Sequence, residues 1–267
     1  MHPMINIALR AARKAGDIID RARENLDQLE ITSKSPSDFV TEVDRAAEKE
    51  IIYHLKKAYP DHAFICEESG LTGSADAEFQ WLIDPLDGTT NFVRDLPHFA
   101  VSIACLRNGR PEHAVVYDPV RREEFTASRG GGAQMNGRRL RIRKSYTKEN
   151  ALFATGIPFA GCSEAQMDAF LSVVKKLSPG SAGVRRCGAA ALDLAYVAAG
   201  RYDAFWETGL QPWDMAAGVL LVQEAGGLVA DYQGGSSFLD SGHIVAASPK
   251  AFKPVLQTVN QAYASLL

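Results

Sequence analysis

The segment Trp81–Phe92 constrains the fold more than any other part of the sequence. Its first three residues are apolar strand formers. Asp84 and Pro85 follow directly, and because proline has no backbone N–H, we expect strand pairing to stop there. Asp87-Gly88 is a turn signal. The segment is therefore expected to deliver two carboxylates, three positions apart, to the end of a strand.

A short helix is predicted directly after this turn. Thr89 or Thr90 is suited to cap a helix that begins near Asn91. The exposed carbonyl of Leu86 would lie beside the N-terminus of this helix. The N–H groups of Gly88 and Thr89 would face the same space, where they suit a phosphate.

Two carboxylates in one turn are costly without a cation. At about 4 Å they repel by roughly 4 kcal/mol at an effective dielectric constant near 20. A hard divalent ion reverses the sign, and carboxylate and carbonyl oxygens are ligands that Mg²⁺ accepts. The alternative is an ordinary Asx turn after a strand. Only the rest of the chain discriminates between the two.

Length, charge and hydropathy exclude several classes of protein. A chain of 267 residues forms one large domain or two halves that share a core. The net charge of -3 argues against a nucleic-acid binder held by bulk charge. No apolar run reaches the roughly 18 residues of a membrane span. The N-terminal segment is charged and lacks a signal-peptide core, so we expect a cytoplasmic protein that binds neither membrane nor nucleic acid directly.

Cysteine and histidine spacing bears on redox state and metal type. The 4 cysteines and 6 histidines are scattered, and no Cys-x-x-Cys pair occurs. This pattern favours reduced thiols over a disulfide framework or a zinc site. We therefore expect any bound metal to have oxygen ligands.

The first half is predicted to combine two helices with a mainly antiparallel sheet. Helix spacing covers residues 4–24, and a second helix runs from Thr41 to just before Pro60. Thr41-x-x-Asp44 matches a capping box. A polar loop is expected at residues 33–38. The predicted strands are 63–66, 99–106, 113–117 and 124–127, with a hairpin turn at Asn136-Gly137.

The second half alternates strands and helices, which is typical of an α/β layer. The composition shifts near residues 145–150. We therefore expect an N-terminal α+β half, 1–147, and a C-terminal α/β half, 148–267, that form one compact unit. The predicted strands are 151–157, 202–206, 228–232 and 243–247, and the predicted helices are 163–177, 189–199, 214–225 and 249–266.

Further acidic residues end or begin predicted elements. Glu67 follows a strand, as Asp84 does, and two adjacent strand ends would bring both carboxylates together. The alternative for Glu67 is a solvated loop. Asp214 opens a helix after Pro212-Trp213, where an ordinary N-cap is the alternative. Glu207 ends a predicted strand.

Competing catalytic motifs are incomplete. The spacing of Gly132 and Gly137 matches a P-loop, but arginines follow in place of Lys-Ser/Thr. No Gly-x-Ser-x-Gly elbow occurs. A dehalogenase-type Asp-x-Asp nucleophile would need one residue between Asp84 and Asp87, and there are two.

Three motifs in order resemble the inositol monophosphatase family, and its bacterial members in particular. The resemblance covers nearly the whole chain. Its motifs are Glu67-Glu68-Ser69, Asp84-Pro85-Leu86-Asp87-Gly88-Thr89-Thr90-Asn91-Phe92, and Pro212-Trp213-Asp214-Met215-Ala216-Ala217-Gly218. The run 191–200 strengthens the bacterial assignment.

The resemblance implies specific ligand and catalytic roles. Glu67, Asp84 and the Leu86 carbonyl would hold one Mg²⁺, and Asp84, Asp87 and Asp214 a second. A third, weaker ion would bind near Glu67 through waters. Thr89 would position the attacking water, with Asp44 behind its hydroxyl. The phosphate would bind the N–H groups of Gly88 and Thr89. Ring contacts would come from Arg185, Gly188, Ala189 and Glu207; at Ala189 many relatives carry a small hydroxyl residue instead.

The resemblance also implies an α+β fold, a layered α/β/α/β/α sandwich, that usually forms a homodimer. The expected activity is Mg²⁺-dependent, lithium-sensitive hydrolysis of myo-inositol 1-phosphate and similar polyol monophosphates by a metal-activated water. Alternatives are the same chemistry on fructose 1,6-bisphosphate, histidinol phosphate or a nucleotide 3′-phosphate. A further alternative is an added scaffold or regulatory role without catalysis.

Overall fold

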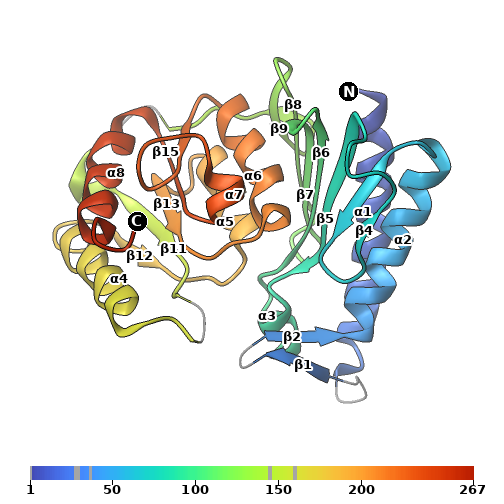
Figure 1. Cartoon of the computed structure of the whole chain (residues 1–267), viewed down its shortest axis with the longest axis horizontal. Helices are drawn as coiled ribbons and strands as arrows, with labels where there is room; N and C mark the ends of the chain where they lie inside the picture. The colour runs from blue at the N-terminus through green and yellow to red at the C-terminus, as the bar shows by residue number, and fades with distance from the viewer. Residues whose placement is uncertain (1, 27–30, 36–37, 144–145, 159–160) are drawn as a thin grey trace.

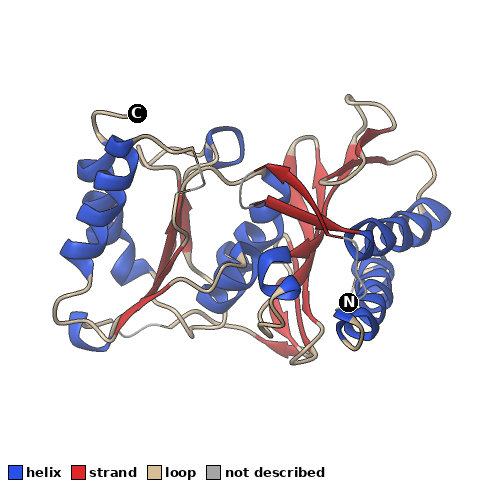
Figure 2. Ribbon diagram, turned by 90° about the horizontal axis from the view of Figure 1, so that it is seen from below, coloured by secondary structure: helices blue, strands red, loops and turns tan. Residues whose placement is uncertain are grey.

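The computed structural model describes residues 2–26, 31–35, 38–143, 146–158 and 161–267. Layers of helices alternate with two β-sheets (Figures 1 and 2). The predicted α+β class and layered α/β/α/β/α sandwich are confirmed.

The first layer consists of α1 (Pro3–Arg23) and α2 (Glu42–Ala58), which pack against each other and cover one face of the large sheet (Figure 1). Helix α1 buries a stripe with helical spacing, as predicted. This stripe comprises Ile5, Ala8, Leu9, Ala12, Ala15 and Ile19. Asp44 and Glu48 are the buried acids of α2.

The large sheet has eight strands in the order β10-β9-β8-β7-β6-β5-β3-β4. Among its described pairs only β3 with β5 is parallel. The predicted antiparallel character of this half is therefore confirmed. The strands are β3 (Ala63–Cys66), β4 (Gly70–Thr72), β5 (Phe79–Asp87), β6 (Ala100–Arg107), β7 (Arg110–Asp118), β8 (Glu123–Ser128), β9 (Gly132–Met135) and β10 (Arg138–Arg139).

Helices α5 (Ala190–Ala198) and α6 (Pro212–Glu224) form the central layer between the two sheets (Figure 1). All nine residues of α5 are buried. A helix that is apolar all round is stable only when both of its sides are covered. The main hydrophobic cluster therefore contains residues from both sheets and from both of these helices.

The second sheet has the order β12-β11-β13-β15-β14 and is mixed, with β11 parallel to β12 and β13. Helices α4 (Glu164–Leu177) and α8 (Pro249–Tyr263) cover its outer face (Figures 1 and 2). Its strands are β11 (Leu152–Thr155), β12 (Gly183–Arg185), β13 (Ala204–Glu207), β14 (Leu228–Ala230) and β15 (Ile244–Ala247). Short helices are α3 (Thr89–Val93), α7 (Phe238–Ser241) and the 3₁₀ turn Lys148–Asn150.

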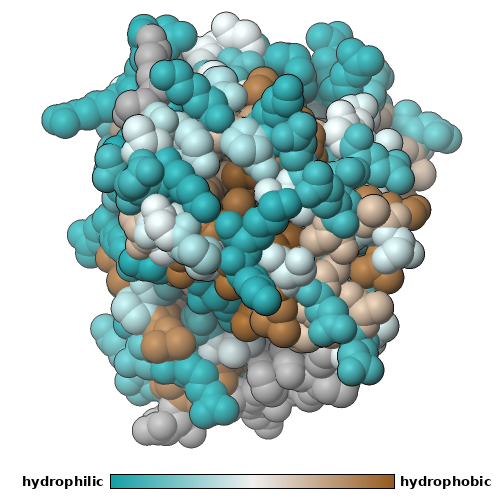
Figure 3. All heavy atoms as spheres, turned by 90° about the vertical axis from the view of Figure 1, so that its left-hand side faces the viewer, coloured by the Kyte–Doolittle hydropathy of each residue, from teal (hydrophilic) through white to brown (hydrophobic). Residues whose placement is uncertain are grey.

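Hydrophilic side chains cover most of the face that carries α4 and α8, with small separate apolar areas between them (Figure 3). Leu171 on α4 is one of the exposed large apolar residues. Scattered single residues of this kind are normal on protein surfaces. Within the described part of the chain, no helix is both long and apolar enough to cross a bilayer.

The structure corrects two predictions in the N-terminal half. Strand β5 does not stop at Asp84: it continues to Asp87 through a bulge, because between the pairs Asp84–Ser102 and Asp87–Ala100 there are two residues on β5 and one on β6. A bulge leaves Pro85 out of the ladder, so its missing N–H breaks no pair. The expected polar loop at 33–38 is wrong at 33–35 and 38, because these residues belong to β1 (Ile31–Ser35) and β2 (Asp38–Thr41), which pair antiparallel. Positions 36 and 37 lie outside the described residues.

Helix boundaries near the predicted turn also shift. Helix α3 begins at Thr89, and its N-cap is Gly88 in the left-handed region (φ 93°), not Thr89 or Thr90. The predicted hairpin turn at Asn136-Gly137 is confirmed, since both residues have positive φ and join β9 to β10. Helix α2 begins right after Thr41, whose side chain lies outside the described residues, so the predicted capping box stays a prediction.

We expect Gly218→Ala to lower the free energy of unfolding by about 1–2 kcal/mol, although alanine normally favours a helix. A Cβ at position 218 would lie 2.4 Å from Leu194 Cβ and 2.6 Å from Leu194 Cδ1, where α6 crosses α5. Urea denaturation measures the change. In a Leu194→Ala background the same substitution should cost less but should still be destabilising, because the contacts with Cγ and Cδ1 are gone while the 2.4 Å approach to Cβ remains. Equal costs in the two backgrounds would contradict this packing account.

Candidate functional site: a cluster of acids between the two sheets

The parallel pairing of β3 with β5 brings Glu67 beside Asp84. Cys66 lies opposite Ile83, and the Glu67 N–H continues this ladder by donating to the Ile83 carbonyl at 3.1 Å. The two carboxyl groups are in hydrogen-bond contact. The prediction that two adjacent strand ends unite these acids therefore agrees with the geometry, and the solvated-loop alternative for Glu67 does not.

The bulge in β5 shapes the acidic turn. The Leu86 N–H donates to Asp84 Oδ1 at 2.9 Å, so one oxygen of this buried carboxyl is held by the main chain. Thr89 Oγ1 lies 3.0 Å from the Leu86 carbonyl oxygen and 3.1 Å from Asp44 Oδ1. A hydroxyl has one hydrogen and donates to one of these acceptors at a time. Its lone pairs can then accept a hydrogen bond from a bound water.

Asp87 caps a helix of the other half of the chain. Its Oδ2 accepts a hydrogen bond from the Ala191 N–H at 2.7 Å, in the first turn of α5. The positive end of a helix favours a carboxylate at this place. Asp87 is thus bonded to the start of α5.

Asp214 reaches the same place from α6. Its Oδ2 accepts a hydrogen bond from the Gln211 N–H at 2.7 Å. The N-cap alternative for Asp214 is wrong, because α6 begins at Pro212 with Gln211 as its N-cap and Asp214 is the third helical residue, where it completes a capping box. The ligand prediction is compatible with this geometry. Ser102 lies opposite Asp84 in the sheet, and its hydroxyl donates to the Trp213 carbonyl at 3.1 Å. This bond joins the start of α6 to the strand beside the acidic turn.

The four acids act on one another electrostatically. Burial raises the pKa of Asp84 well above its ordinary value, and the charges of Glu67, Asp87 and Asp214 raise it further. Burial also raises the pKa of Asp87, to about 7, against the lowering effect of the α5 N–H groups. Burial and then the charge of Asp87 raise the pKa of Asp214. These shifts mean that the carboxylates are close enough to repel one another when ionised.

The donor set fits a hard divalent cation. All four side chains offer carboxylate oxygens, and the Leu86 carbonyl adds a neutral one. Each of the three aspartates keeps one oxygen on a backbone N–H. The remaining oxygens give a small ion several ligands without breaking the local structure.

The second predicted group lies next to the acids. Glu207 ends β13 and is buried against Gly156, where a Cβ would come within 1.8 Å of its Oε1. Burial raises the pKa of Glu207 to about 8, and the charge of Asp87 contributes. Gly88 packs against the Gly188 carbonyl oxygen and Ala189 Cβ, which would lie 3.2 and 3.3 Å from an added Cβ. The predicted phosphate turn and the predicted ring segment are therefore in contact.

The two neighbouring arginines differ in their surroundings. The exposed side chain of Arg185 reaches the Val184 carbonyl at 3.4 Å. The charge of Arg186, not that of Arg185, lowers the pKa of Glu207 and of Asp193. The family resemblance implied Arg185 for the ring site, and Arg186 was not among the predicted residues. The sequence shows that two arginines are adjacent here. Only the direction of the backbone after β12 decides which of the two side chains faces the acids.

Glu48 is a second residue that the sequence analysis missed. It is 3% exposed, and its Oε2 accepts a hydrogen bond from the Glu68 N–H at 2.9 Å. Helix α2 thereby fixes the segment that carries Glu67. Its position on the buried stripe of α2 was the available signal, since a charged residue on such a stripe is rarely unpaired.

The fold and the acid cluster define a phosphatase-type α/β/α/β/α protein, and comparison with known proteins agrees. The model of the inositol monophosphatase family matches residues 1–264, so this chain belongs to that family. It is 59% identical over 261 residues to the Nus factor SuhB of Pseudomonas aeruginosa, covering 97% of this chain and 96% of the relative. The family is generally metal-dependent.

Solved structures support the same assignment. The extragenic suppressor protein suhB of Bartonella henselae has a TM-score of 0.93 and 40% identity, covering 97% of this chain and 99% of that one. An inositol monophosphatase from Anabaena (Nostoc) has a TM-score of 0.84 and 35% identity, with 96% and 95% coverage.

The raised pKa values predict how the stability of the metal-free protein depends on pH. Carboxyl groups whose pKa is raised on folding hold protons that the unfolded chain releases. The contribution of these groups to stability should therefore be fully present below about pH 4 and be lost as the pH rises through about 7–8, the pKa values of Asp87 and Glu207. Urea denaturation at a series of pH values measures this loss.

Asp87→Asn should make that loss of stability shallower, because the amide does not titrate. Asp76→Asn, at an exposed acid of the 73–78 loop, is the matched control and should leave the slope unchanged. A metal-free wild-type protein whose stability is constant between about pH 5 and 8 would contradict the assignment of these shifts.

Proposed function

We propose that this protein hydrolyses the monophosphate ester of a small polyol, with myo-inositol 1-phosphate as substrate and Mg²⁺ as cofactor. The observation that carries the proposal is the convergence of Glu67, Asp84, Asp87 and Asp214, whose charges interact. The family assignment supports a phosphatase, and the hard oxygen donors favour Mg²⁺ over softer ions.

Glu67, Asp84, Asp87, Asp214 and the Leu86 carbonyl would hold the ions. Ions held there would supply a water of lowered pKa and would stabilise negative charge on the leaving oxygen. This mechanism needs no covalent intermediate. It therefore agrees with a site made of acids that includes no activated serine or cysteine.

Thr89 would orient the water. Its hydroxyl donates to Asp44 Oδ1, so its oxygen can accept a hydrogen bond from the O–H of the water. Asp44 is only 1% exposed, so its carboxylate has little freedom to move. It would therefore fix the orientation of the Thr89 hydroxyl. The phosphate would accept hydrogen bonds from the N–H groups of Gly88 and Thr89, because Gly88 turns the chain at the start of α3.

Glu207 would accept hydrogen bonds from ring hydroxyls, beside Gly188 and Ala189. Its raised pKa reflects burial, and a neutral hydroxyl donor is a suitable partner for such a group. Either Arg185 or Arg186 would complete this side, and the electrostatic effect on Glu207 favours Arg186. The same proposal includes the division of the chain into two halves, 1–147 and 148–267, that form one compact unit. It also includes a homodimer of the chain.

A substrate panel with released phosphate as the readout tests the ester. Inositol 1-phosphate should be preferred over fructose 1,6-bisphosphate, histidinol phosphate and a nucleotide 3′-phosphate in the presence of Mg²⁺. Faster turnover of one of the other esters would assign this chain to that reaction instead. Lithium at millimolar concentration should inhibit, and unchanged turnover would count against that part of the proposal.

A second candidate role comes from the names of the relatives. Those at 59% and 54% identity are called Nus factor SuhB. This name supports a regulatory role for the present chain that depends on binding a partner and not on catalysis. A catalytically inactive variant that still restores the phenotype of a gene deletion would favour that role.

Asp87→Asn should reduce phosphate release by more than about 100-fold. Loss of a residue that only supports a metal ligand typically costs about 10–100-fold, and loss of a direct ligand should cost more. The fold should survive, since the amide oxygen can still accept from the Ala191 N–H. Turnover is measured in parallel with circular dichroism, and Asp76→Asn is again the control. Normal turnover of a folded Asp87→Asn protein would show that the acid cluster is not the active site.

Arg186→Ala should raise KM for the ester by roughly 10-fold, near the lower limit for the loss of a charged hydrogen bond. Arg185→Ala, the matched control, should change KM by less than about twofold, because that guanidinium is exposed and bonded to a local carbonyl. Steady-state kinetics on both variants decides the question. The reverse order of effects would return the role to Arg185.

A further inference from the structure

Three side chains with metal-ligating atoms converge outside the acid cluster. One ligand atom each of His98, Cys187 and Asp193 lies within 4.8 Å of the other two. His98 comes from the loop before β6, and the other two come from the start of α5 and the residues that precede it. We propose that these residues form a second metal site, which binds Zn²⁺ or a similar transition-metal ion.

Two atoms of this group are buried without a partner. Within the described residues, neither His98 Nε2 nor Asp193 Oδ1 has a hydrogen-bond partner. Asp193 is only 1% exposed. Buried polar atoms are almost always paired, so an unpaired imidazole nitrogen and an unpaired carboxylate oxygen at one place need an explanation. A bound cation would satisfy both atoms.

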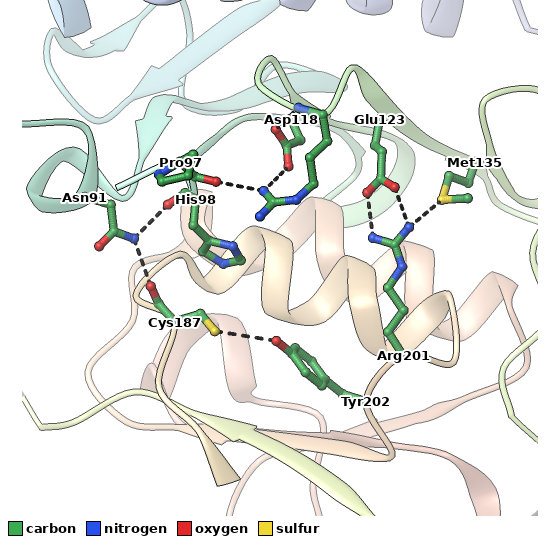
Figure 4. Close-up of polar contacts among 10 residues, drawn as sticks. Asn91, Pro97, His98, Asp118, Glu123, Met135, Cys187, Arg201 and Tyr202 are labelled. Carbon is green, nitrogen blue, oxygen red and sulfur yellow. Dashed lines mark hydrogen bonds and ion pairs between the residues drawn. The ribbon is translucent and has the colours of Figure 1, made fainter. Parts of the chain in front are cut away.

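The main chain around the site is held in place. Asn91 Nδ2 donates to the His98 carbonyl at 2.7 Å and to the Cys187 carbonyl at 2.8 Å (Figure 4). One amide group thus ties two of the ligand residues together across the two halves of the chain. Metal ligands fixed by their surroundings lose less freedom on binding.

The thiol has a suitable outer partner. Cys187 Sγ lies 3.5 Å from the Tyr202 hydroxyl, and Figure 4 shows the two side chains facing each other. When the thiol is deprotonated and its sulfur is bound to a metal, the Tyr202 hydroxyl can donate a hydrogen bond to that sulfur. The positive charge of Arg121, which acts on His98, is itself paired with Asp118 at 2.9 Å.

The donor atoms select the class of metal. Imidazole nitrogen and thiolate sulfur suit Zn²⁺ and related ions, whereas Mg²⁺ prefers oxygen alone. Ligand distances of about 2.0–2.3 Å place tetrahedral ligand atoms roughly 3.3–3.8 Å apart. Side-chain movements of about 1 Å would therefore close the site around an ion, with the fourth position left for water.

The site shares no ligand with the acid cluster but touches the same helix. Asp193 lies two residues after Ala191, whose N–H binds Asp87. An ion held by His98, Cys187 and Asp193 would fix the first turn of α5 against the loop that precedes β6. No soft-metal site was expected from the sequence, because its cysteines and histidines are scattered and His98 is far from Cys187 along the chain.

Titration of Co²⁺ into the metal-free, reduced full-length protein tests the proposal. Saturating Mg²⁺ is included to occupy the acid cluster. We expect one Co²⁺ per chain to produce a thiolate-to-cobalt charge-transfer band in the near ultraviolet, and Zn²⁺ to displace it. A site made of carboxylates cannot give this band. Absence of the band in the wild-type protein would overturn the proposal.

Single variants identify the ligands. Cys187→Ser should abolish the charge-transfer band, whereas Cys162→Ser, at a thiol outside the group, should retain it. His98→Asn should weaken Zn²⁺ binding at least 10-fold in competition with a chromophoric chelator. Circular dichroism separates loss of folding from loss of a ligand. A band that survives Cys187→Ser, or Zn²⁺ affinity that is unchanged in a folded His98→Asn protein, would overturn the assignment.

Discussion

Repulsion among ionised carboxylates is the constraint on which the site depends. Asp84, Asp87 and Asp214 each keep one oxygen on a backbone N–H, which holds the acids in place while they repel one another. Burial adds to the cost of ionisation, as the raised pKa values reflect. This arrangement of carboxylates lowers the stability of the protein. The best explanation for it is a bound ligand that turns the repulsion among the carboxylates into attraction. A divalent cation is the simplest such ligand.

The same groups join the two halves of the chain. Asp87 belongs to β5 of the large sheet and caps α5, and Ser102 of β6 holds the start of α6. Asn91 connects the turn after β5 to the Cys187 segment. The halves therefore meet through specific polar contacts as well as through the central apolar cluster. Movement of one half against the other would disturb the acids directly, which links rigidity of the core to geometry at the site.

Sequence reasoning succeeded where a local pattern decides the structure. The stripe of α1, the strand at 63–66 and the turn at Asn136-Gly137 are set by nearby residues, and all were predicted. It failed where contacts between distant segments decide. The bulge that carries β5 past Pro85 depends on pairing with β6, and the effect of Arg186 on Glu207 depends on the direction of the chain after β12. Adjacent strand ends suggested that Glu67 lies beside Asp84, but the ligand roles of Glu67 and Asp214 came from the family resemblance, because no spacing rule relates positions so far apart.

The most direct test of the account is anomalous diffraction from crystals grown with Mn²⁺ in place of Mg²⁺. The account predicts anomalous peaks bounded by oxygens of Glu67, Asp84, Asp87 and Asp214, within ordinary metal–oxygen bonding distance of at least two of these side chains. Crystals saturated with Mn²⁺ that show no peak among these four acids, or peaks only elsewhere on the protein, would contradict it.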